Sequence, residues 1–75
     1  MIIENLIAFY ETDYAFCEAG ETFDAEAYHN ARMRALGASM FLDYTGEVSF
    51  EEIEKVYEDY CQKLTNLLEE RMMKK

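Results

Sequence analysis

The clearest helical pattern in the chain is VSFEEIEKVYEDYCQKLTNLLEERMM, residues 48–73. Ser49 and Glu52 within it form a capping box, in which the serine hydroxyl accepts a hydrogen bond from a backbone N–H group of the first turn and the glutamate reciprocates. Beyond this cap, apolar residues recur at near-heptad spacing as far as Met72. The pattern predicts a long helix that reaches the lysine pair at residues 74–75, where positive charge suits the helix dipole.

Two earlier helices are predicted because the chain has no proline, only three glycines, and apolar residues spaced three and four positions apart. The first is expected at Ile2–Ala19, with Gly20 as its C-terminal stop. The second is expected to begin after Asp24, whose side chain can cap it, and to continue to about Tyr44. Together these elements predict an all-α fold, a small three-helix up-down-up bundle with a long C-terminal helix, in which residues 1–75 form a single acidic helical domain.

The first two helices carry apolar stripes at helical spacing. The stripe expected to enter the core from the first helix consists of Ile3, Leu6, Ile7, Tyr10, Tyr14 and Cys17, widened by Phe9 and Phe16. A small face of the second helix, which a neighbouring helix could approach closely, consists of Ala27, Ala31, Ala35 and Ser39. A bulkier face beside it consists of Met33, Leu36, Met40 and Tyr44.

The third helix is expected to be longer than the first, at about 1.5 Å of rise per residue. Its last turns would then carry apolar side chains that the first helix does not cover. Leu67, Leu68 and Met72 are therefore the candidate contacts for self-association or for a partner.

Negative charge is concentrated in the first helix and at the start of the third. The sequence has 16 Asp and Glu against 7 Lys and Arg, a formal net charge of -9 at pH 7, and residues 1–31 contain no lysine or arginine. Glu4, Glu11 and Glu18 recur every seven residues and so form a row along one outward face of the first helix. The acids expected to contact a partner are Glu4, Glu11, Asp13, Glu18, Glu21, Asp24, Glu47, Glu51, Glu54 and Glu58.

This charge disfavours direct binding to nucleic acid or to anionic membranes, whose phosphates the carboxylates would repel. No apolar run approaches the length of a membrane span. The residues MIIENLIAFYETDY have no basic region ahead of their apolar side chains, so a secretory signal is not expected. The sequence therefore predicts a cytoplasmic protein in which Cys17 and Cys61 are reduced core residues, with an interhelical disulfide as the alternative for an exported chain.

Two motifs resemble metal sites in part. Glu26 and His29 have the Glu-x-x-His spacing of bundle di-iron sites, but two such motifs are required, and only a symmetric dimer could supply the second. Residues 43–52 align with positions three to twelve of an EF-hand loop, but position one would be Phe41, which has no side-chain oxygen. The capping box explains the final glutamate of that alignment without calcium. Neither a metal nor another cofactor is expected.

Catalysis is not indicated either, because the chain has one histidine and its cysteines lie in apolar stripes, so no nucleophile is paired with a base. A row of carboxylates on a rigid helix can instead compete for a basic surface that normally holds nucleic acid phosphates. The predicted function is thus a small non-enzymatic acidic protein that binds and inhibits or modulates a nucleic-acid-handling protein, such as a CRISPR nuclease. Phage-encoded DNA mimics and anti-CRISPR proteins share this size, charge and helicity. The alternative is a helical interaction module, a homodimer, an antitoxin-like partner or an assembly subunit, that recognises its partner through apolar surface.

Overall fold

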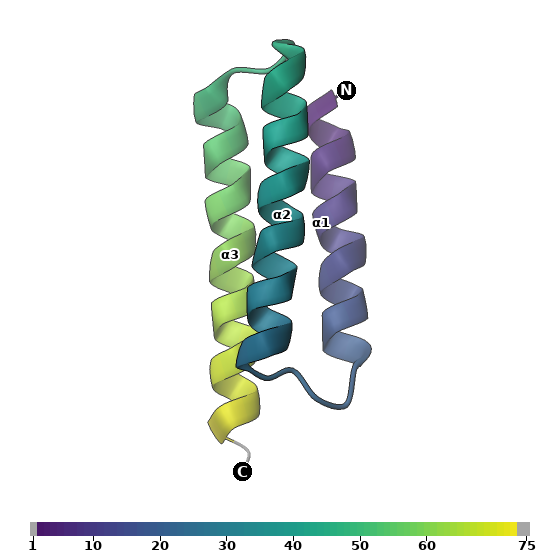
Figure 1. The fold of residues 1–75 in the computed structure, drawn as a ribbon, viewed down its shortest axis with the longest axis vertical. Helices are drawn as coiled ribbons and strands as arrows, with labels where there is room; N and C mark the ends of the chain where they lie inside the picture. The colour runs from purple at the N-terminus through teal and green to yellow at the C-terminus, as the bar shows by residue number, and fades with distance from the viewer. Residues whose placement is uncertain (1, 74–75) are drawn as a thin grey trace.

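Three helices make up the part of the chain that the computed structural model describes, residues 2–73. They are α1 (Ile2–Ala19), α2 (Ala25–Thr45) and α3 (Phe50–Met73). The two connections lie at opposite ends of an elongated bundle, so successive helices run in opposite directions (Figure 1). The predicted all-α fold is confirmed, and this arrangement is consistent with the predicted up-down-up bundle.

The caps predicted for α2 and α3 are present. The Asp24 side chain accepts a hydrogen bond of 2.9 Å from the backbone N–H of Ala27, and the Ser49 hydroxyl accepts one of 3.3 Å from the N–H of Glu52. At the far end of α2, Gly46 adopts the left-handed conformation with φ of 72° and donates its N–H to the carbonyl of Asp43. Each of these contacts satisfies a backbone group that a helix end would otherwise leave unpaired.

The C-terminal end of α1 is closed in a different way. The helix ends at Ala19, as predicted, but Gly20 is not in the left-handed conformation that glycine C-caps usually adopt. Instead the Arg71 guanidinium, from the last turns of α3, donates to the carbonyl oxygens of Gly20 at 2.9 Å and Glu18 at 2.6 Å. A cation at this position also suits the negative end of the helix dipole.

The core lies between the small face of α2 and the inner faces of α1 and α3. Ala31 and Ala35 are fully buried and Ser39 is nearly so, because these short side chains let the other two helices approach the α2 backbone. Tyr10 of α1 and Tyr60 of α3 stack above them, with ring centroids 4.5 Å apart and planes 7° apart. The remaining large core residues are Leu6, Phe23, Leu42, Ile53, Leu64 and Leu67.

Two expectations about apolar side chains are wrong. Phe16 does not widen the core stripe of α1, since its side chain is 80% exposed and lies beside Cys17 and Arg34 at the rim of the bundle. Leu67 is not an uncovered contact, since it is 2% exposed and belongs to the same core cluster as Phe23. The connection between α1 and α2 brings Phe23 under the end of the bundle and so extends the core farther along α3 than the length of α1 implies.

Candidate functional site

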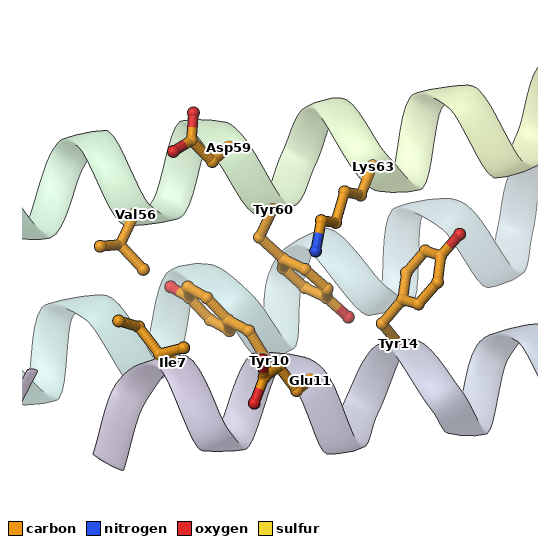
Figure 2. Close-up of a pocket in the computed structure, with 8 residues that line it drawn as sticks. All are labelled: Ile7, Tyr10, Glu11, Tyr14, Val56, Asp59, Tyr60 and Lys63. Atoms are coloured by element: carbon orange, nitrogen blue, oxygen red, sulfur yellow. The ribbon is translucent and has the colours of Figure 1, made fainter. Parts of the chain in front are cut away.

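The acidic row of α1, defined as Glu4, Glu11 and Glu18, faces solvent along the length of the helix. Glu11 also lies at one edge of a groove between α1 and α3, opposite Asp59 of α3 (Figure 2). We call this feature the acidic groove. The residues that line it are Ile7, Tyr10, Glu11, Tyr14, Val56, Asp59, Tyr60 and Lys63, around a volume of about 290 Å³.

The floor of the acidic groove is apolar and aromatic. The stacked rings of Tyr10 and Tyr60 fill the space between the two helices, while Ile7 and Val56 line one end of the groove (Figure 2). The Tyr10 hydroxyl points away from the groove and donates to the backbone carbonyl of Ala35 at 3.0 Å. Carboxylates at the edges and aromatic rings on the floor are groups that hold a cationic side chain with an apolar stem.

One cation of this chain already occupies that position. The Lys63 ammonium lies 5.9 Å from the centroid of the Tyr14 ring, a distance at which cation–π attraction operates. The Lys63 side chain is exposed, and a lysine stem is flexible, so this contact is one that solvent and other groups can reach.

Asp13 differs from the other acids of α1, because it belongs to the fold. Its carboxylate accepts hydrogen bonds from Arg34 Nε at 2.9 Å and from the Tyr60 hydroxyl at 2.6 Å, and its side chain is 12% exposed. The interpretation of Asp13 as a partner-binding residue is therefore corrected, because both of its oxygens are engaged inside the bundle. Glu11, and not Asp13, lines the acidic groove. Asp24 is likewise engaged, as the N-cap of α2.

The two arginines of α2, Arg32 and Arg34, contact different helices. Residues two positions apart on a helix point in nearly opposite directions, so only Arg34 reaches α1. Arg32 turns the other way, lying 5.7 Å from the centroid of the Tyr28 ring, and its pKa is raised mainly by a hydrogen bond with Tyr57 of α3. The contact of the arginine pair with α1 is therefore the one between Arg34 and the Asp13 carboxylate.

The buried hydroxyl and thiol groups near the groove stay protonated at neutral pH. Burial raises the pKa of Tyr10 to about 12. Burial, followed by the hydrogen bond to Asp13, raises the pKa of Tyr60 as well. Burial, followed by the charge of Asp13, raises the pKa of Cys17, which disfavours the reactive thiolate.

The remaining predicted acids do not gather at the groove. Glu21 and Glu47 are exposed in the two connections. The acids on the side of α3 turned away from the core, all exposed, are Glu51, Glu54 and Glu58. Asp59 is not among the acids predicted to contact a partner. The sequence contained a signal for it, because Asp59 directly precedes the buried Tyr60 and follows Val56 by three residues, which places it beside the core.

The bulkier face of α2 was also missed as a surface. Met33, Leu36, Met40 and Tyr44 all have exposed side chains, with Tyr44 92% exposed. Among the predicted oligomer contacts of α3, Leu68 is half-buried against the core and Met72 is exposed. Exposed apolar side chains at helical spacing therefore lie along α2 as well as at the end of α3.

The partial EF-hand match has a structural explanation. Across residues 2–73, no three His, Cys, Asp or Glu side chains come together as a metal site. Gly46 and Ser49, which lie in the partial EF-hand match, cap the end of α2 and the start of α3. In the same residues, no helix combines the length and apolarity needed to cross a bilayer.

Comparisons with models of protein families, with curated proteins and with solved structures find no match to this chain.

Proposed function

We propose that this chain is a small non-enzymatic modulator that binds a basic surface of a nucleic-acid-handling protein through α1 and the acidic groove. One observation supports the proposal above the others: Glu11 and Asp59 stand at opposite edges of an open groove with an aromatic floor. A lysine or arginine of a partner would meet carboxylates and ring faces together there.

The spacing of the acidic row supports competition with nucleic acid. Glutamates seven residues apart lie about 10 Å apart along a helix, close to the length of three nucleotide steps of one DNA strand at about 3.4 Å each. The row therefore imitates the field of a phosphate backbone at lower charge density. Long-range attraction to a basic cleft depends on that field more than on matched contacts.

The test uses purified DNA- and RNA-binding effectors, including a CRISPR nuclease, and measures inhibition of nucleic acid binding or cleavage. The double variant Glu11→Lys/Glu18→Lys should weaken inhibition by about 100-fold, since each reversal turns an attraction into a repulsion. Glu54→Lys/Glu58→Lys is the matched control, because it changes the net charge equally on the far side of α3, and it should change inhibition by less than about threefold. Equal losses of inhibition in both double variants would mean that net charge alone accounts for the effect, without a contribution from the acidic groove.

Salt dependence gives a second readout. Contacts between charges near the surface weaken as the Debye length falls from about 10 Å at 0.1 M salt to about 3 Å at 1 M. Inhibition should therefore decline steeply with added salt in the wild type, and less steeply in the variant Glu11→Lys/Glu18→Lys.

A second candidate function is an interaction module that works through apolar surface. The exposed apolar side chains of α2 favour it. The two functions are compatible, because α2 contributes no residue to the acidic groove.

A further inference from the structure

Helix α2 is apolar on two opposite sides. Its inner side packs into the core through Ala31, Ala35 and Leu42. Its outer side carries an apolar stripe at spacings of three and four residues, which we call the outer α2 face: Met33, Leu36, Gly37, Met40 and Tyr44. A helix with apolar residues all round is normally covered on both sides.

The rest of residues 2–73 covers the outer α2 face only in part, with Leu36 37% exposed and Tyr44 92% exposed. Met40 is 62% exposed, and Met33 and Leu36 are exposed as well. Phe41, 68% exposed, adds an aromatic ring at its edge. Single exposed apolar residues are ordinary, but a contiguous group of this kind marks an interaction surface.

The distribution of charge favours a second copy of this chain as the partner that covers this face. Helix α2 has two acids, Glu26 and Asp43, and two arginines, Arg32 and Arg34, so their charges cancel. In α1 there are four acids and no lysine or arginine, and α3 has seven acids against three such bases. Two copies of a chain with net charge -9 repel each other. Their mutual repulsion is smallest when they meet through α2, and a basic partner would gain least there.

The available area is sufficient for a modest dimer. A buried aromatic side chain contributes about 150–250 Å², so Tyr44 and Phe41, 92% and 68% exposed, together with the exposed parts of the two methionines and Leu36, offer at most about 600 Å² per copy. Two copies would bury at most about 1,200 Å², the lower end of the range for specific interfaces.

Gly37 fits the same arrangement. A Cβ atom built at this position would meet nothing within 4 Å inside the chain. Neither packing nor a positive φ within the chain requires glycine there, and glycine lowers helix propensity. A glycine near the middle of an exposed apolar stripe lets the backbone of a second helix come close.

We propose that two copies of this chain associate about a two-fold axis through the outer α2 face, with their α2 helices crossing near Gly37. The contact is isologous, so each copy supplies the same residues. The acidic groove stays open in the dimer, since it is built from α1 and α3 alone. The inference does not depend on the proposed function.

Sedimentation equilibrium of the full chain tests the proposal. The wild type should populate a dimer, and Met40→Glu should raise its dissociation constant by about 100-fold or more, because the two-fold axis brings two unpaired carboxylates into one apolar contact. Phe16→Glu is the matched control: it adds the same charge at an exposed apolar position on α1, 80% exposed against 62% for Met40, and should change the dissociation constant by less than about threefold. Circular dichroism of each variant establishes that the helices remain intact.

Added salt should leave the dimer unchanged or strengthen it, since screening reduces the repulsion between two acidic copies. This response has the opposite sign to that expected for binding a basic partner, so the two proposals fail separately. A chain that sediments as a monomer up to millimolar concentration overturns the dimer. A dimer that resists Met40→Glu but is broken by Leu68→Glu or Met72→Glu overturns the assignment of its interface to α2.

Discussion

The inner and outer sides of α2 differ in both residue size and burial. The short side chains of two alanines and a serine are buried on the inner side together with Leu42, whereas two methionines and a tyrosine are 47–92% exposed on the outer side. Burial on the inner side follows from geometry, because a helix between two neighbours must be narrow for both to approach. Within residues 2–73 the larger side chains of the outer side are covered only in part, so they would gain further burial in the dimer proposed above.

The largest effect is expected from a pair of substitutions that change residue size at adjacent positions of α2, one on the inner side and one on the outer side. Ala35→Leu adds volume at a fully buried site and should lower the free energy of unfolding by about 3 kcal/mol. Leu36→Ala should change it by no more than about 0.5 kcal/mol. Urea unfolding in a Met40→Glu background, which keeps the copies apart, measures both. Similar losses from the two substitutions would contradict the division of α2 into an inner and an outer side.

The tyrosine stack on the inner side predicts a loss of stability at high pH. Burial holds the pKa of Tyr10 at about 12, above the value near 10 of the unfolded chain. A group whose pKa is raised by folding stabilises the fold below the unfolded pKa, and this contribution is lost as the pH rises through the folded pKa. Between pH 10 and 12, the free energy of unfolding should therefore fall by about 1.4 kcal/mol per pH unit from Tyr10. Tyr10→Phe should flatten this decline, and an unaltered slope would count against the burial of its hydroxyl.

Arg34 lies between the inner and outer sides of α2 and binds the Asp13 carboxylate. Its substitution tests whether Asp13 is held inside the bundle. Arg34→Ala leaves the nearly buried carboxylate with the Tyr60 hydroxyl as its remaining hydrogen-bond donor of the two described. The free energy of unfolding should fall by about 1–2 kcal/mol, measured by thermal or urea unfolding. A smaller loss, near the about 0.5 kcal/mol of an exposed ion pair, would indicate that Asp13 is hydrated and available to a partner after all.

The smallest effect separates Gly37, which lies inside α2, from Gly46, which caps the C-terminal end of the same helix. Gly37→Ala should raise the free energy of unfolding of the monomer by about 0.5–1 kcal/mol, because its Cβ meets open space on a helix. Gly46→Ala should lower it by about 1 kcal/mol, because Gly46 has φ of 72°. Thermal unfolding in the Met40→Glu background compares them. A loss at Gly37 in that background would assign the glycine a role inside the chain.

The sequence was sufficient to locate the helices, because their ends are decided by neighbouring residues. Asp24, Ser49 and the turn at Thr45–Val48 act within one helical turn of the backbone groups that they cap. The bounds of α1 agree with those expected, although its closing contact comes from Arg71. Capping residues close to the helix ends were therefore sufficient to predict most of the helix bounds.

The faces were less predictable, because periodicity gives the direction of a stripe but not which neighbour covers it. Phe16 and Leu67 were misplaced for this reason, the first beyond the edge of the core and the second inside it. The engagement of Asp13 depends on Tyr60, 47 residues away. Such contacts follow from how the helices pack, which spacing along one helix does not determine.

The hydrogen bonds from Arg71 to the end of α1 affect the order in which the ends of the helices can be completed. The carbonyls of Glu18 and Gly20 receive these donors from a residue more than 50 positions later in the chain. Because α1 precedes α3 in the chain, the end of α1 lacks the Arg71 donors until the last turns of α3 have packed against it. Closure of this helix end therefore depends on tertiary packing and not on a neighbouring residue.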